Sequence, residues 1–156
     1  MAGVAAIGFD LGETLLRYAG TPPSWAGLYP AALARVAEAC GAKPDARQML
    51  AAGQILGRHN TRLHPRRRET DSGIIFRELL AAWSLAPEPL LAPAIAAYFD
   101  FFQQRLAPYP ETAAVLAALR QSGIRIGVLT DVPYGMPRDF VQRDLEIGRA
   151  SWRERV

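Results

Sequence analysis

Two short apolar segments of the sequence end in residues that could take part in catalysis. Residues 4–9 (V-A-A-I-G-F) run into Asp10, and residues 124–129 (I-R-I-G-V-L) run into Thr130. Their length and abrupt end predict two buried strands of a parallel sheet. In open α/β sheets, ligands bind at the carboxyl ends of the strands, where both side chains would lie. Asp10 is therefore a candidate catalytic residue, although an Asp in this position can equally cap a helix or form a turn.

The sequence around both residues resembles two motifs of the haloacid dehalogenase-like (HAD) hydrolase superfamily. Residues 8–16 (G-F-D-L-G-E-T-L-L) resemble motif I, an apolar strand followed by D-x-D-x-T. Residues 126–130 (I-G-V-L-T) resemble motif II, an apolar strand that ends in Ser or Thr. Residues 108–123 look like the helix before motif II in the phosphoglycolate phosphatase-like branch. The resemblance covers residues 1–145 and implies an α/β fold, a HAD-like Rossmannoid parallel sheet with an inserted all-helical cap domain.

The pattern between the motifs is helical. Apolar residues at helical spacing predict helices over 33–40, from Pro44 to 56, from a cap at Asp71 to 83, over 95–106, and from Pro110 to Gly123. The stretch 17–106 therefore reads as a helical cap without strands, inserted into a partial core domain of residues 1–16 and 107–145. Residues 133–135 predict a turn, and a helix follows from Pro137.

The resemblance also implies a chemistry for the strand ends. Asp10 would be the nucleophile that forms an aspartyl-phosphate, and the Thr130 hydroxyl would hold a phosphoryl oxygen. Mg²⁺ would be bound by Asp10 and the backbone carbonyl of Gly12, and Thr14 would fix the motif I loop. The implied function is a Mg²⁺-dependent phosphatase that acts on a small phosphorylated metabolite.

The sequence departs from the family pattern at two supporting positions. Gly12 replaces the second Asp of D-x-D-x-T, which protonates the leaving group in the family. Glu13 is adjacent, but neighbouring side chains point apart. Asp131 stands where an Asn usually follows motif II. These departures leave open a metal-free 2-haloacid dehalogenase, which shares the Asp nucleophile, or a catalytically inactive homologue that serves as a binding or regulatory module.

The end of the sequence predicts a fragment with a foreign tail. Residues 146–156 (E-I-G-R-A-S-W-R-E-R-V) resemble the translation of a sequencing adaptor, so we expect the natural sequence to stop near Leu145. Only two strands are predicted, and no Lys or Arg of motif III and no acidic pair of motif IV is found in residues 1–145. Lys43, the only lysine, lies between two cap helices. We therefore expect the chain as given to be inactive.

Composition excludes several other classes. The formal charge of +3 and the lack of an Arg-rich segment with interleaved aromatic residues argue against nucleic-acid binding. No apolar run reaches the roughly 18 residues of a membrane span. Cys40, the only cysteine, fits a reducing cytoplasm. The basic stretch 58–68 could close over an anionic substrate, but a solvated loop is the simpler interpretation. The oligomeric state is not indicated.

Overall fold

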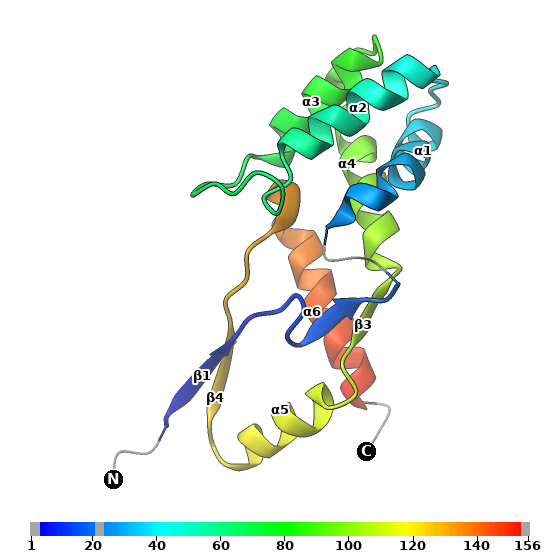
Figure 1. The fold of residues 1–156 in the computed structure, drawn as a ribbon. Coiled ribbons are helices and arrows are strands. Elements are labelled where there is room, and N and C mark those ends of the chain that lie inside the picture. The colour runs from blue at the N-terminus through cyan, green and yellow to red at the C-terminus, as the bar shows by residue number, and fades with distance from the viewer. Residues whose placement is uncertain (1–3, 21–23, 154–156) are drawn as a thin grey trace.

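The computed structural model describes residues 4–20 and 24–153, and side chains up to residue 146 (Figure 1). Strands β1 (Ala6–Phe9) and β4 (Arg125–Val128) pair in parallel, with Ala6 opposite Arg125 and Phe9 opposite Val128. Helix α5 (Thr112–Gln121) leads into β4 through Gly123, whose positive φ of 71° suits glycine. The two predicted strands and their parallel pairing are confirmed.

The prediction that these strands are buried is wrong for the described residues. Strand β1 alternates between exposed and half-exposed positions, β4 is exposed at every position except Ile126, and Leu129, directly after β4, is 84% exposed. One face is partly covered by four buried leucines, three from the segment after β1 and Leu116 of α5. Within residues 4–20 and 24–153 no other strand joins this sheet, so its outer edges and second face remain open.

A second, antiparallel pair of strands was not predicted. Strand β2 (Leu16–Tyr18) pairs with β3 (Leu106–Pro108), so that the chain entering the helical region lies beside the chain leaving it. Leu106, predicted to lie on a helix, instead pairs with Tyr18. The expectation of a stretch 17–106 without strands is therefore wrong at both ends. Pairing here satisfies backbone groups that a single strand would leave open.

Four helices and a short 3₁₀ helix make up the region between β2 and β3. They are η1 (Trp25–Leu28), α1 (Tyr29–Ala39), α2 (Ala46–Arg58), α3 (Ser72–Ala82) and α4 (Pro87–Gln103). The predicted Asp71 cap is confirmed, because its carboxylate accepts a hydrogen bond from the Gly73 amide. The second helix begins two residues after Pro44, because Asp45 and Gln48 form a reciprocal capping box.

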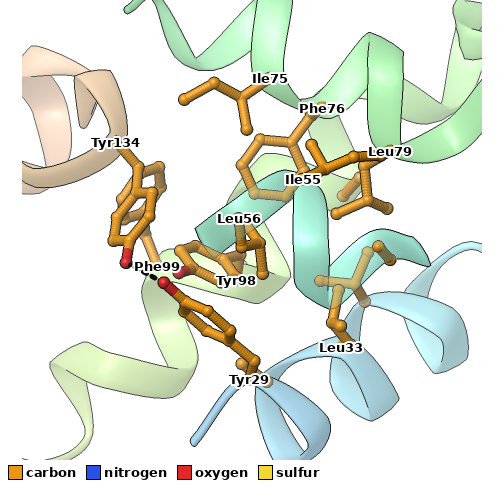
Figure 2. Close-up of a cluster of buried hydrophobic side chains, with 14 of the residues drawn as sticks. Tyr29, Leu33, Ile55, Leu56, Ile75, Phe76, Leu79, Tyr98, Phe99 and Tyr134 are labelled. Atoms are coloured by element: carbon orange, nitrogen blue, oxygen red, sulfur yellow. Dashed lines mark hydrogen bonds between the residues drawn. The ribbon is translucent and has the colours of Figure 1, made fainter. Parts of the chain in front are cut away.

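The main hydrophobic core lies among these helices, which we call the cap (Figure 1). Its centre consists of aromatic side chains packed edge to face or stacked, with Trp25 stacked on Phe102 at a centroid distance of 3.8 Å. Three fully buried residues, Phe76, Tyr98 and Phe99, contact one another in the same cluster (Figure 2).

The chain after β4 crosses from the strand pair to the cap. The predicted turn is the short helix η2 (Pro133–Gly135), followed by α6 (Arg138–Arg153). Tyr134, Met136 and Phe140 of this segment are buried in the cap core. Helix α6 continues through position 146, and the side chains of residues 147–156 lie outside the described part, so the prediction of a foreign tail remains a prediction.

In the part of the chain that the structure describes, no single helix is long and apolar enough to cross a membrane. Helices α3 and α4 meet the requirement only together, as a pair bent by 113°. Both helices contribute their apolar residues to the cap core.

Candidate functional site

Asp10 and Thr130 follow the carboxyl ends of the paired strands β1 and β4 and line the same cleft. The strand register pairs Phe9 with Val128, and the Leu129 amide donates to the Phe9 carbonyl at 2.9 Å. Asp10, Leu129 and Thr130 line one cleft of about 650 Å³ between the strand ends and the cap. Gly12, Glu13 and Asp131 line it as well. The fold thus brings together five of the six predicted site residues.

The Asp10 carboxylate is exposed and held by its own loop. One oxygen accepts a hydrogen bond from the Leu11 amide at 2.8 Å, and the other accepts from the Thr14 hydroxyl at 3.4 Å. Thr14, the sixth predicted residue, thus reaches the site by contact with Asp10. A carboxylate fixed at a strand end and open to the cleft can attack an electrophile or bind a cation.

Positions 12 and 13 do not supply an acid that is free to act beside Asp10. Gly12 has open space where a side chain would begin, because no atom lies within 4 Å of a Cβ built there. Glu13 has a positive φ of 59°, and its carboxylate accepts a hydrogen bond from the Tyr109 hydroxyl at 3.1 Å. Glu13 lines the cleft and Tyr109 does not, so the Glu13 carboxylate is already engaged by a residue outside the cleft.

The second strand end presents a hydroxyl and a carboxylate. The Thr130 hydroxyl donates to the backbone carbonyl of Asp131 at 3.2 Å, and Asp131 is exposed. A hydroxyl in this position can turn to donate to an anionic ligand. Asp131 adds a negative charge to a cleft that already contains Asp10 and Glu13.

The loop between α2 and α3 also lines the cleft, so it is more than the solvated loop that the sequence favoured. Asn60, Thr61, Arg62 and Arg66 line the cleft. Arg66 is held in an ion pair with Glu69 and donates to the His59 carbonyl at 2.8 Å. Arg62 is exposed, and its guanidinium has no partner among the described residues. Arg62 is thus an available cation in a cleft that four carboxyl groups, those of Asp10, Glu13, Asp131 and Asp144, also line.

A buried carboxyl group, Asp144 of α6, was missed by sequence reasoning. It lines the cleft, accepts a hydrogen bond from the Gln103 side chain at 2.6 Å, and accepts another from the Tyr18 hydroxyl at 3.5 Å. Burial raises its pKa to about 6, and the two hydrogen bonds oppose that rise. Its position four residues after Phe140, on the apolar face of a helix, is the signal that could have revealed it.

Tyr134 was predicted only as part of a turn, yet it joins the cleft to the cap core. It lines the cleft, is 3% exposed, and its hydroxyl lies 2.6 Å from that of Tyr29. Burial and the neighbouring Tyr29 hydroxyl raise the pKa of its phenol, so Tyr134 is protonated at neutral pH. No pattern in the sequence distinguishes it from an ordinary turn residue.

The donor set at the strand ends fits Mg²⁺ in chemical type. The cation prefers hard oxygen ligands, and usually binds one or two carboxylates together with water and substrate phosphate. The Asp10 carboxylate and the Gly12 carbonyl belong to this class and line the same cleft. Among the described residues, no group of three or more His, Cys, Asp or Glu side chains is arranged to hold a metal ion. Any cation would therefore depend on water and substrate for further ligands.

A family model described as "Hydrolase: haloacid dehalogenase-like hydrolase" matches residues 4–152. No curated protein matches the chain. No solved structure matches it either.

Proposed function

Because the chain belongs to the haloacid dehalogenase-like hydrolase family, we propose that it carries the nucleophile of a Mg²⁺-dependent phosphatase of the phosphoglycolate phosphatase-like branch. The substrate is a small phosphomonoester, and the reaction passes through an aspartyl-phosphate. The observation that carries this proposal is the placement of Asp10 and Thr130 at adjacent ends of paired parallel strands, in one cleft.

Asp10, Gly12 and Thr130 would each have a distinct role in phosphoryl transfer. A carboxylate oxygen of Asp10 attacks phosphorus, the bond from phosphorus to the ester oxygen breaks, and the Thr130 hydroxyl donates to a phosphoryl oxygen. Asp10 and the Gly12 carbonyl would bind Mg²⁺, which supplies positive charge to offset the repulsion between the carboxylate and the phosphate. Water then hydrolyses the aspartyl-phosphate and restores Asp10.

Gly12 determines which esters react well. It provides no acid to protonate the departing oxygen, and Glu13 is engaged by Tyr109. General acid help is typically worth about 10²–10⁴-fold. The proposal therefore includes a preference for esters whose leaving group is stable as an anion, such as aryl phosphates.

The test is an assay of the complete protein with p-nitrophenyl phosphate, with and without Mg²⁺. Asp10→Asn should abolish turnover while the protein stays folded by circular dichroism. Asp45→Asn is the matched control, because the same chemical change at a helix N-cap preserves capping far from the cleft. Retained turnover in folded Asp10→Asn would contradict the proposal.

The same assay separates the alternatives. Metal-independent release of halide from a 2-haloacid would identify a dehalogenase, whose carbon-centred reaction needs no acid at position 12. Absence of both activities in a folded, complete protein would identify a binding or regulatory homologue. The proposal includes a cytoplasmic location, which cell fractionation tests. It also includes inactivity of the 156-residue chain alone, which the same assay tests when it is applied to that chain.

A further inference from the structure

The segment that carries Thr130 is fixed at both of its ends by different parts of the molecule. On one side, the Leu129 amide donates to the Phe9 carbonyl and closes the β1–β4 pairing. On the other side, Tyr134 is buried in the cap core, only four residues after Thr130. Thr130 therefore lies on a short span between the strand pair and the cap.

The Tyr134 side chain is held by contacts with three cap elements, η1, α1 and α4. Its hydroxyl pairs with the Tyr29 hydroxyl of α1 at 2.6 Å (Figure 2), and the Tyr29 oxygen accepts a hydrogen bond from the Asn60 amide at 2.9 Å. Its ring stacks against Trp25 at a centroid distance of 5.6 Å and meets the Tyr98 ring edge to face at 5.7 Å. Such a chain of buried hydrogen bonds and ring contacts permits few alternative positions.

The backbone at this point is equally constrained. Tyr134 has φ 56° and ψ 30°, the left-handed region that L-residues other than glycine rarely adopt. Gly135 follows with φ 60°, and a Cβ there would lie 2.1 Å from the Thr70 carbonyl oxygen and 2.7 Å from the Ser72 nitrogen. An unfavourable conformation persists only where the surroundings enforce it, and such residues cluster at functional sites.

We propose that Tyr134 is a positioning residue: its anchorage in the cap sets where the Thr130 hydroxyl lies relative to Asp10. The effect is indirect, because Tyr134 acts through three intervening residues. It follows that the cap and the phosphoryl-binding strand end are mechanically coupled, so that a change at Tyr29 or Asn60 reaches Thr130. The effect of Tyr134 on the position of Thr130 follows from the contacts above. Its effect on turnover rests on the proposed function.

The structural consequence is tested by the mobility of the Thr130 methyl group in the complete protein, measured as an NMR order parameter. Tyr134→Phe retains the ring and removes the hydroxyl pair, so the fold should persist while the Thr130 methyl becomes more mobile. Thr112, buried in α5, is the internal reference and should not change. Ser122→Ala is the control, because it removes a hydroxyl hydrogen bond, to the Ala118 carbonyl at 3.0 Å, at the end of α5 and outside the cleft.

The catalytic consequence is tested by a double-mutant cycle. Tyr134→Phe should lower kcat about tenfold, in line with the cost of a small misplacement of a catalytic group. If Tyr134 acts through Thr130, the same change in a Thr130→Ala background should have almost no effect. A merely structural role would instead give equal losses in both backgrounds. Ser122→Ala should leave kcat unchanged in both.

The outcomes separate this inference from the function on which it builds. An unchanged Thr130 methyl in folded Tyr134→Phe, or additive losses in the cycle, would overturn it. A wild-type protein without Mg²⁺-dependent phosphatase activity would overturn the proposed function, and the NMR comparison would still decide whether Tyr134 positions Thr130.

Discussion

The cap and the β1–β4 pair contain similar apolar residues but bury them to very different extents. Phe76, Phe99 and Phe102 in the cap are fully buried, whereas Val128 and Leu129 at the end of β4 are 39% and 84% exposed. The cap helices are close in sequence and cover one another. The two parallel strands come from distant parts of the chain, and a parallel sheet needs cover on both faces. The fold of the cap is therefore determined locally, whereas that of the strand pair depends on what packs against it.

This difference has a consequence for how each region responds to mutation. In the cap core, neighbouring atoms surround each buried side chain closely, so a small added volume must displace something. Around β1 and β4 the described residues leave open space.

The largest effect is expected for an added methyl group where the chain enters the cap. Gly135→Ala places a Cβ 2.1 Å from the Thr70 carbonyl and requires a left-handed alanine, so we expect a loss of about 4 kcal/mol in the free energy of unfolding. Gly127→Ala in β4 is the matched control, because nothing lies within 4 Å of its Cβ. Urea denaturation of both variants measures the difference. Equal losses would show that β4 is as closely packed as the cap.

A gain of function is expected at the open strand end. Gly12→Asp restores the acid that the family motif contains, and position 12 has space for it and no positive φ. Turnover of alkyl phosphates by the complete protein should rise about 10²-fold, the lower end of general acid catalysis. Gly12→Asn, of similar size without the acid, should give no gain. An equal rise with Asn would show that the side chain acts by shape and not by proton transfer.

The predicted parts of this fold depend on local signals. Helical spacing and capping residues such as Asp71 are visible in the sequence, and the strand ends at Asp10 and Thr130 follow from apolar runs that stop abruptly. The missed parts depend on contacts between distant residues. Tyr18 pairs with Leu106, which lies 88 residues further along the sequence. Tyr134 is an ordinary turn residue until Tyr29 and Trp25 surround it.

The candidate site shows the same limit. The residue types at positions 10, 12 and 130 indicate their chemistry, but the sequence does not show that Arg62 and Asp144 line the same cleft. Their roles depend on how the cap folds over the strand ends. The shifted pKa of Asp144 is a property of its burial, which only the assembled cap creates.

A pH effect on stability is expected from Asp144. Its pKa is raised from 3.8 to about 6 by burial, so between these pH values the folded protein binds more protons than the unfolded chain. The free energy of unfolding should therefore fall as the pH rises through this range, by roughly 2 kcal/mol, since one pKa unit corresponds to about 1.36 kcal/mol. Asp144→Asn should remove this fall and make the protein more stable than wild type at pH 7.

The control for this experiment is Asp131→Asn, which removes an exposed carboxylate from the other side of the cleft. Urea denaturation at pH 4.5, 6 and 7.5 gives the three profiles. A wild-type profile parallel to that of Asp144→Asn would show that Asp144 reaches water and is not buried in solution.

The smallest effect is expected at the end of α6. If residues 146–156 are foreign to the protein, nothing adapted them to the core, and truncation after Leu145 should change the free energy of unfolding by less than about 1 kcal/mol. Truncation after Asp139 is the contrasting variant, because it also removes Phe140, which is 4% exposed and packs against Phe99 at a centroid distance of 5.3 Å. That loss should reach about 3 kcal/mol or more, the cost of deleting a buried aromatic side chain. Similar losses for both truncations would show that residues beyond Leu145 stabilise the cap and belong to the protein.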